Sequence, residues 1–220
     1  MSGGLQFKVC GVRRPADAVA AAEAGAAYLG FNFFPGSPRA LNLVQYRELA
    51  GELPPVSRVA VTVEPTLAEL TTLEEAGFDA VQIHFRTELP LAQISGWSER
   101  IGPTRLWLAP KLPPGEDIPA AWLPLADTWM LDTYQPGVFG GSGRTGDWGK
   151  FARHQLGHPE KVWLLAGGLN ADNIGEAVRQ SGARFVDVNS GIESAPGVKD
   201  HFKLKAFATS LRTTTGSISR

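Results

Sequence analysis

The stretch Thr128-Trp-Met-Leu-Asp132-Thr-Tyr-Gln-Pro-Gly-Val-Phe-Gly-Gly-Ser-Gly-Arg-Thr-Gly-Asp147-Trp148 contains the pattern that decides the fold. Its apolar run, Trp129 to Leu131, predicts a buried strand that ends on a carboxylate, Asp132. A glycine-rich loop follows, and Asp147 is the expected N-cap of a helix from Trp148 to His154. In α/β proteins, ligands bind where a strand ends and such a loop begins. Asp132 is therefore a candidate catalytic carboxylate; the alternative is that it only caps its own turn.

The same alternation of strand and helix extends along the chain in both directions. Short apolar or alternating runs predict eight strands, at Leu5–Cys10, Ala27–Phe34, Ser57–Thr62, Ala80–His84, Arg105–Ala109, Trp129–Leu131, Val162–Ala166 and Arg184–Val188. Each is followed by a segment with helical signals, at Asp17–Ala24, Leu43–Glu52, Leu67–Ala76, Leu91–Ile94, Ile118–Leu123, Trp148–His154, Ala171–Gln180 and Asp200–Leu211. Glycine and proline mark most of the boundaries between them.

Alternating strands and helices predict a parallel sheet with right-handed crossovers, because parallel neighbours need a long connection between them. Eight such units in 220 residues suit a single (β/α)8 TIM barrel of the α/β class. We expect this one domain to cover residues 1–212, with a flexible tail over 213–220. An open doubly wound sheet is the alternative, but a G-x-G-x-x-G after the first strand is lacking.

Composition restricts the class of protein. A net charge of −1 gives no broad basic surface, which argues against nucleic acid and anionic membranes as partners. A single cysteine cannot form an internal disulfide, which is typical of a reducing compartment. The first residues do not resemble a secretion signal, and no apolar run approaches the roughly 20 residues that span a bilayer. We therefore expect a soluble cytoplasmic protein, either a monomer or a homodimer.

In a (β/α)8 barrel, the active site is built where the strands end. Those ends carry Cys10, Arg39, His84, Asp132, Gly167-Gly168 and Ser190-Gly191. Gln82 and His84 alternate with apolar neighbours and should point into the barrel, although His84 alone could be a polar core residue. The four histidines form no helical pair with a carboxylate, so no metal site is expected.

The glycine turns that follow the seventh and eighth predicted strands are candidate phosphate loops. Gly167, Gly168 and Gly191 would expose backbone N–H groups, and the helix that follows adds the positive end of its dipole. The alternative is that these glycines serve only as turn residues.

Cys10 and Asp132 would approach a substrate from opposite sides of the barrel mouth, because the first and sixth strands lie far apart in the ring. That geometry suits a base and an acid that act on different atoms. Cys10 shares a strand face with Lys8. A free thiol has a pKa of about 8.5, so this pKa must fall, or the substrate must help, if Cys10 is to work at neutral pH. Cys10 could instead be a small buried apolar residue. Arg39 is a candidate clamp for a carboxylate, or else a solvated loop charge.

Several short motifs occur in a fixed order along the chain. They are Lys8-Val-Cys10-Gly, Gly30-Phe-Asn-Phe-Phe-Pro-Gly-Ser-Pro-Arg39, Gln82-Ile-His84, Leu131-Asp132-Thr133, Gly140-Gly-Ser-Gly143, Asp147-Trp148, Leu165-Ala-Gly-Gly-Leu169 and Asp187-Val-Asn-Ser-Gly-Ile-Glu193. Together they resemble the phosphoribosylanthranilate isomerase family, (β/α)8 enzymes of tryptophan biosynthesis. The resemblance extends from about Phe7 to Lys199.

The resemblance implies an Amadori rearrangement of N-(5-phosphoribosyl)anthranilate to 1-(2-carboxyphenylamino)-1-deoxyribulose 5-phosphate, with no cofactor. Asp132 matches the family's general acid, Cys10 its general base, and Arg39 the residue that faces the anthranilate carboxylate. The remaining candidates are Gln82, His84 and Asp187 for the substrate, and Gly143, Gly167, Gly168, Ser190 and Gly191 for the phosphate.

The sequence departs from the family pattern at several positions. Asn32 replaces a usual aliphatic residue, and Phe85 replaces a usual glycine, so both are expected to reshape the wall around the aromatic ring. The run Arg105 to Ala109 lacks the lysine common in relatives, and Asn189 replaces a small residue before Ser190.

Two other functions remain as alternatives. One is a different aminoaldose-to-ketose isomerase, such as that of histidine biosynthesis, which usually has an aspartate where this chain has Cys10. The other is a non-catalytic sugar-phosphate-binding barrel, which would gain nothing from pairing Cys10 with Asp132.

Overall fold

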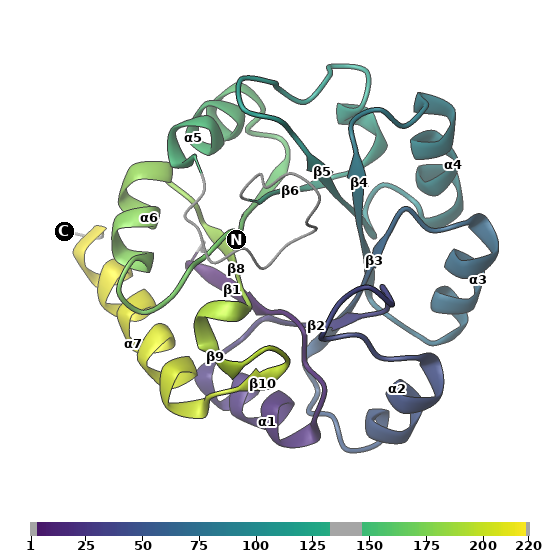
Figure 1. The fold of residues 1–220 in the computed structure, drawn as a ribbon. Coiled ribbons are helices and arrows are strands. Elements are labelled where there is room, and N and C mark those ends of the chain that lie inside the picture. The colour runs from purple at the N-terminus through teal and green to yellow at the C-terminus, as the bar shows by residue number, and fades with distance from the viewer. Residues whose placement is uncertain (1–3, 133–146, 219–220) are drawn as a thin grey trace.

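The computed structural model describes residues 4–132 and 147–218 and shows eight parallel strands that close into a barrel in sequence order (Figure 1). The strands are β1 (Gln6–Val9), β2 (Tyr28–Asn32), β3 (Ser57–Val63), β4 (Ala80–Arg86), β5 (Leu106–Lys111), β6 (Thr128–Leu131), β7 (Val162–Leu165) and β8 (Phe185–Val188). β1 pairs with both β2 and β8, which closes the ring. The predicted fold class is confirmed.

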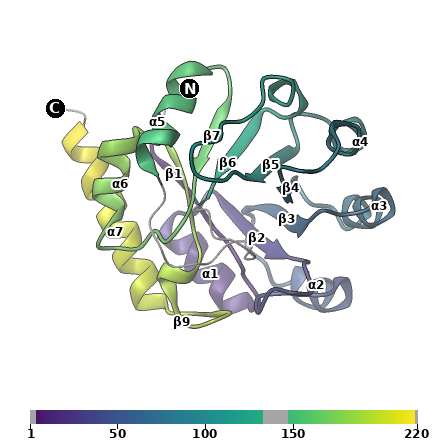
Figure 2. The same ribbon diagram turned by 45° about the horizontal axis from the view of Figure 1, so that its top comes forward.

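Helices surround the barrel on its outer side (Figures 1 and 2). In the described residues they are α1 (Pro15–Ala24), α2 (Leu43–Ala50), α3 (Leu67–Glu75), α4 (Leu91–Ile101), α5 (Trp148–Gly157), α6 (Ile174–Ser181) and α7 (His201–Ile218). Side chains fix several of their starts, because the first N–H groups of a helix lack partners within it. Asp147 caps α5, as predicted, by accepting a hydrogen bond from the Lys150 N–H at 2.8 Å.

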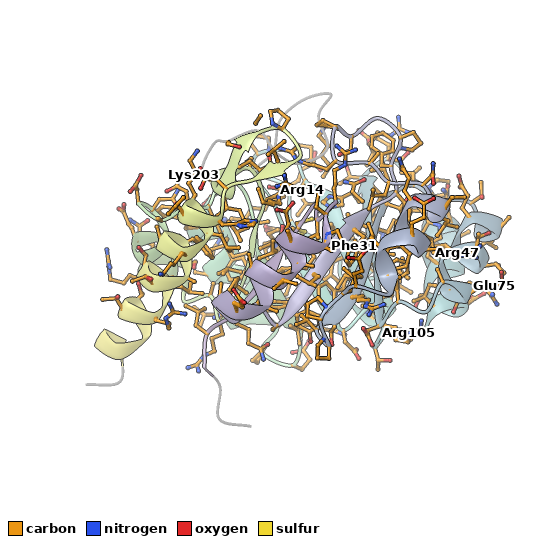
Figure 3. The ribbon with its side chains drawn as sticks, turned by 90° about the horizontal axis from the view of Figure 1, so that it is seen from below. Arg14, Phe31, Arg47, Glu75, Arg105 and Lys203 are labelled. Carbon is orange, nitrogen blue, oxygen red and sulfur yellow. The ribbon has the colours of Figure 1, made fainter. Side chains whose placement is uncertain are left out.

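Alternation along the strands produces two apolar layers. Inward side chains, including Trp107 and Phe185 with ring centres 5.6 Å apart, fill the barrel below its mouth. Outward side chains pack against the helices. Phe31 on β2 is fully buried against Tyr46 of α2, with ring centres 5.1 Å apart, whereas Arg47 of the same helix is exposed (Figure 3). The period of two thus decides which residues of each strand can reach the cavity.

Two predicted helices are wrong in extent or in kind. The helix expected at 118–123 is absent from the described chain, and a single 3-10 turn, Leu123–Leu125, precedes β6. Pro119 and Pro124 remove backbone donors there, which disfavours an α-helix. α4, by contrast, continues past the predicted end at Ile94, because Ile94, Trp97 and Ile101 repeat at helical spacing and are buried.

The C-terminal part also differs from the sequence prediction. α7 runs beyond Leu211 to Ile218, so the predicted helix end is wrong, while the flexibility of residues 213–220 stays a prediction. Between β8 and α7 the chain forms a 3-10 turn, η2 (Ser190–Ile192), and an unpredicted antiparallel hairpin of β9 (Glu193–Ala195) and β10 (Val198–Lys199). The hairpin lies next to α1 in Figure 1. Among the helices of the described residues, none is long and apolar enough to cross a membrane.

Candidate active site

A polar cavity of about 670 Å³, its open mouth included, lies at the carboxyl ends of the strands. It collects side chains and loops from both halves of the chain, as expected for a barrel mouth. The predicted site residues that line it are Cys10, Arg39, Gln82, His84, Asp132, Gly167, Gly168, Asp187 and Ser190. Gly143, a predicted phosphate ligand, lies outside the described residues.

Cys10 lies above a buried ion pair. Lys8 and Asp187 are register partners on β1 and β8, and the Lys8 Nζ donates to the Asp187 Oδ1 at 2.5 Å. Burial raises the pKa of the Cys10 thiol, and the charge of Lys8 opposes that rise without cancelling it. The thiol pKa therefore does not fall in the free protein, so the substrate must contribute if Cys10 is to act as a base.

Arg39 is fixed by a carboxylate that the sequence did not indicate. Its Nε and Nη2 donate to Glu193 of the β9–β10 hairpin at 3.1 and 2.6 Å. Lys199 Nζ donates to the same carboxylate at 2.9 Å. Burial alone would raise the pKa of Glu193, but its bonds to Arg39 and Lys199 lower the pKa overall. Burial lowers the pKa of Lys199, and its contact with Glu193 opposes that fall, so the cluster of Arg39, Lys199 and Glu193 carries one positive charge in excess as long as Lys199 is protonated.

Gln82 and His84 both point into the barrel from β4, as their alternation predicts. The Gln82 Nε2 lies 2.7 Å from the His84 Nε2, and the Gln82 Oε1 is buried without a partner among the described residues. Burial, with a smaller effect of the Lys8 charge, lowers the pKa of His84 to about 4. His84 is therefore a neutral imidazole at physiological pH, able to donate or accept a hydrogen bond.

The two candidate phosphate loops are packed against each other. Gly167 and Gly168 have φ angles of 97° and 61°, which other residues rarely adopt. The Asn173 side chain donates to the Gly168 carbonyl at 2.9 Å, tying the β7 loop to the start of α6. Gly191 lies outside the cavity lining, and a Cβ there would be 2.0 Å from the Leu169 carbonyl oxygen. Gly191 therefore allows the two loops to pack closely, and its contact with a phosphate stays a prediction.

Asn32, Asn189 and Phe85, which depart from the family pattern, have defined surroundings in the structure. Asn32 lines the cavity, and its Oδ1 accepts a hydrogen bond from the Phe34 N–H at 2.8 Å, which shapes the loop before Arg39. The Asn189 Oδ1 accepts from Lys199 Nζ at 2.7 Å. Phe85 faces away from the cavity and packs edge-on against Trp97 at 5.6 Å. The expectation that Phe85 narrows the ligand wall is therefore wrong.

The sequence assigns no role to three charged residues that support the site. Glu193 and Lys199 lie on a hairpin too short to give a periodic signal, and Lys8 is marked only by a family motif and by the strand face that it shares with Cys10. An aliphatic strand interrupted by a lysine could have indicated a buried partner, because a buried ammonium group needs one. Within the described residues, no three His, Cys, Asp or Glu side chains come together as a metal site would require.

The barrel and the polar cavity at the ends of its strands define the class of protein, a (β/α)8-barrel enzyme. The family model described as N-(5'-phosphoribosyl)anthranilate (PRA) isomerase matches residues 7–210. The chain therefore belongs to the phosphoribosylanthranilate isomerase family of tryptophan biosynthesis and is an isomerase.

Individual relatives agree with this assignment. The N-(5'-phosphoribosyl)anthranilate isomerase of Pseudomonas putida KT2440 is 41% identical over 213 residues, covering 94% of this chain and 98% of the relative. The crystal structure of phosphoribosyl anthranilate isomerase from Thermus thermophilus has a TM-score of 0.78 at 31% identity, covering 95% of this chain and 99% of that one.

Another solved isomerase of the family is in complex with reduced 1-(o-carboxyphenylamino)-1-deoxyribulose 5-phosphate. It has a TM-score of 0.72 at 29% identity and covers 95% of this chain and 99% of its own.

Proposed function

We propose that the protein converts N-(5-phosphoribosyl)anthranilate into 1-(2-carboxyphenylamino)-1-deoxyribulose 5-phosphate, with Asp132 as general acid and Cys10 as general base. The observation that carries the proposal is that both side chains line one cavity from β1 and β6, next to two glycine turns. An acid and a base at separate places around a sugar can act on different atoms of it.

The first step is opening of the ribose ring. Asp132 gives its proton to the ring oxygen while the C1–O bond breaks, and the nitrogen lone pair forms the C1=N bond of a protonated Schiff base. Cys10 as thiolate then removes the proton from C2, and the electrons of that C–H bond form an enolamine. Protonation of this intermediate at C1 and loss of the C2 hydroxyl proton give the ketone. The cationic Schiff base acidifies the C2 proton, which offsets the weak tendency of the buried thiol to ionise.

We assign the substrate's two anionic groups to two different sets of donors in the cavity. The backbone N–H groups of the loops at Gly167-Gly168 and Ser190 suit the 5-phosphate. The anthranilate carboxylate would meet the Nη1 of Arg39, because Glu193 already holds the Nε and Nη2 atoms. Neutral His84, Gln82 and Asp187 remain for the hydroxyl groups of the sugar. Arg39 would therefore donate a charged hydrogen bond to the substrate from Nη1, while its Nε and Nη2 remain bound to Glu193 of the hairpin.

The test is turnover of freshly prepared N-(5-phosphoribosyl)anthranilate, followed by the loss of anthranilate fluorescence above spontaneous decay. We expect Asp132→Asn to lower kcat by at least about a thousandfold and Cys10→Ala by at least about a hundredfold, the scale of general acid and base catalysis. Both should bind the reduced product analogue within about tenfold of the unmodified protein, because neither change removes a phosphate or carboxylate contact.

Asp127→Asn is the matched control, because Asp127 precedes the same strand at the opposite end of the barrel and is about half exposed, at 48%. It should turn over normally. If the unmodified, folded protein is inactive, the proposed substrate is wrong. A near-normal kcat in Cys10→Ala would remove the thiol from the mechanism. Equal losses of turnover and analogue binding in Asp132→Asn would show that this carboxylate has a structural role.

A further inference from the structure

We propose that Lys8 is a positioning residue for Cys10: its buried ammonium group, held by Asp187, lies beneath the thiol and stabilises the thiolate that removes the C2 proton. This inference rests on the proposed role of Cys10 and extends it. Lys8 does not touch the substrate itself, because its side chain is fully buried.

The backbone fixes the relative positions of the three groups. Lys8 and Cys10 are two residues apart on β1 and therefore point to the same, inner side of the barrel. Lys8 is the direct register partner of Asp187 on β8, and their charged atoms are 2.5 Å apart. The end of the Lys8 side chain and the Cys10 Sγ also border the same small space beside Gly30 of β2. One cation is thus paired with a permanent carboxylate and lies next to the candidate base.

A glycine on the neighbouring strand makes room for this contact. A Cβ at Gly30 of β2 would lie 2.9 Å from the Lys8 Cε and 3.2 Å from the Cys10 Sγ. The φ angle at Gly30 is not in the left-handed region, so the backbone does not require glycine there. Glycine is required there because any side chain would collide with Lys8 and Cys10, whose side chains fill the space next to Gly30. The packing therefore keeps these two side chains close together.

Lys8 carries its charge in the folded protein. Burial would lower the pKa of Lys8, but Asp187 and Cys10 outweigh burial and leave it raised. The same charge contributes to keeping His84 neutral. When Cys10 ionises, the positive charge of Lys8 favours the thiolate and the negative charge of Asp187 opposes it.

Other charges also face Cys10 and must be considered with Lys8. Lys199 of β10 favours the thiolate, and Asp187 of β8 opposes it. Among residues 4–132 and 147–218, the titratable and charged groups on the surrounding elements are Lys8, His84, Asp132, Asp187, Lys199 and the Arg39–Glu193 pair. Removing Lys8 or Asp187 changes the charge next to the thiol in opposite directions, which gives the proposal a signature that loss of packing would not produce.

The chain offers a direct test, because Cys10 is its only cysteine and any thiol alkylation reports on it alone. The rate of alkylation by iodoacetamide is measured by mass spectrometry between about pH 7 and pH 11.5, and its midpoint gives the apparent thiol pKa. We expect Lys8→Met to move the midpoint up by at least about one unit and Asp187→Asn to move it down by a similar amount, the scale of a neighbouring charge. Lys8→Arg should keep most of the original profile, since it keeps the cation.

Circular dichroism and thermal melting establish that each variant is folded. If Lys8→Met alone does not fold, Lys8→Met combined with Asp187→Asn removes both charges, and its midpoint should lie above that of Asp187→Asn alone. Midpoints that stay in place, or that move in the same direction in the Lys8→Met and Asp187→Asn variants, would overturn the proposal.

Turnover separates this inference from the proposed function. If Cys10→Ala is inactive but the alkylation profile is the same in Lys8→Met as in the unmodified protein, Cys10 remains the base and the proposed role of Lys8 is wrong. If Cys10→Ala turns over normally, the base assignment itself is wrong, whatever the alkylation profile shows.

Discussion

Replacing Gly191 with alanine should separate the two loops that we assign to the phosphate. Gly191 lies in η2, after β8, and a Cβ there would be 2.0 Å from the Leu169 carbonyl oxygen and 2.8 Å from the Asn170 Cβ. Ordinary contact begins at about 3.4 Å, so the β8 turn must move away from the β7 loop by more than an ångström. Because the obstructing atom belongs to the backbone, no side-chain rotation can relieve the clash.

The expected cost follows from overpacking. Forcing one extra carbon into a close-packed site costs about 3 kcal/mol, the upper part of the usual range. In a domain of this size that corresponds to a fall in melting temperature of about 6–12 °C. Gly168 and Ser190 line the cavity on the two sides of this contact. When the loops separate, the N–H groups of these two residues should no longer be placed to bind the same phosphate. We expect KM for the phosphorylated substrate to rise about tenfold or more, with a smaller change in kcat.

The assay combines thermal melting with the fluorescence turnover assay, and Gly96→Ala serves as the matched control. Gly96 lies inside α4, and the nearest atom to a Cβ there is the Leu67 Cδ2 at 3.9 Å. That variant should instead gain about 0.5–1 kcal/mol, because alanine favours the helix over glycine. A Gly191→Ala protein that melts within about 1 °C of the unmodified chain and keeps its KM would refute the reasoning.

Two further predictions concern charge. Glu193→Gln should destabilise the fold by about 3 kcal/mol in urea unfolding and raise KM several-fold, because Arg39 and Lys199 would lose their shared carboxylate; unchanged KM would mean that Arg39 is held without it. His84 has a pKa of about 4 in the folded protein and about 6.5 in the unfolded chain, so the unfolded chain binds the proton more tightly. The free energy of unfolding should therefore fall as the pH drops from about 6.5 to about 4. The loss should reach about 1–2 kcal/mol at pH 5 and disappear in His84→Gln, and an NMR pKa near 6.5 would contradict it.

The barrel could be predicted from the sequence because its signals are local. The strand at Thr128–Leu131 is a short apolar run next to a glycine-rich segment, and the cap of the helix that follows is a single aspartate. In a parallel barrel, the carboxyl ends of all strands lie at the same mouth, so the last residues of the predicted strands are also the predicted lining of the cavity. The strand ends therefore predict that Cys10, His84 and Asp132 share one cavity, and all three line it in the structure.

Phe85 shows where this argument fails. It follows His84 directly, and comparison with the family pattern made it a wall residue, yet one step along a strand turns a side chain to the opposite face. Phe85 is fully buried between Trp97 and Trp122, outside the barrel. Because side chains alternate between the two faces of a strand, β4 must point Phe85 away from the face that carries Gln82 and His84.

What the sequence could not supply is the pairing of charges between distant segments. Asp187 lies 179 residues from Lys8, and Glu193 lies 154 residues from Arg39, so no local pattern connects them. Each pair forms only when the barrel closes through the contact of β1 with β8 and when the hairpin after β8 returns over the mouth. A carboxylate from the last part of the chain therefore fixes a cation from the first part at both places. The candidate base and the candidate carboxylate ligand depend on closure of the barrel, and we infer that the site is complete only when the whole chain has folded.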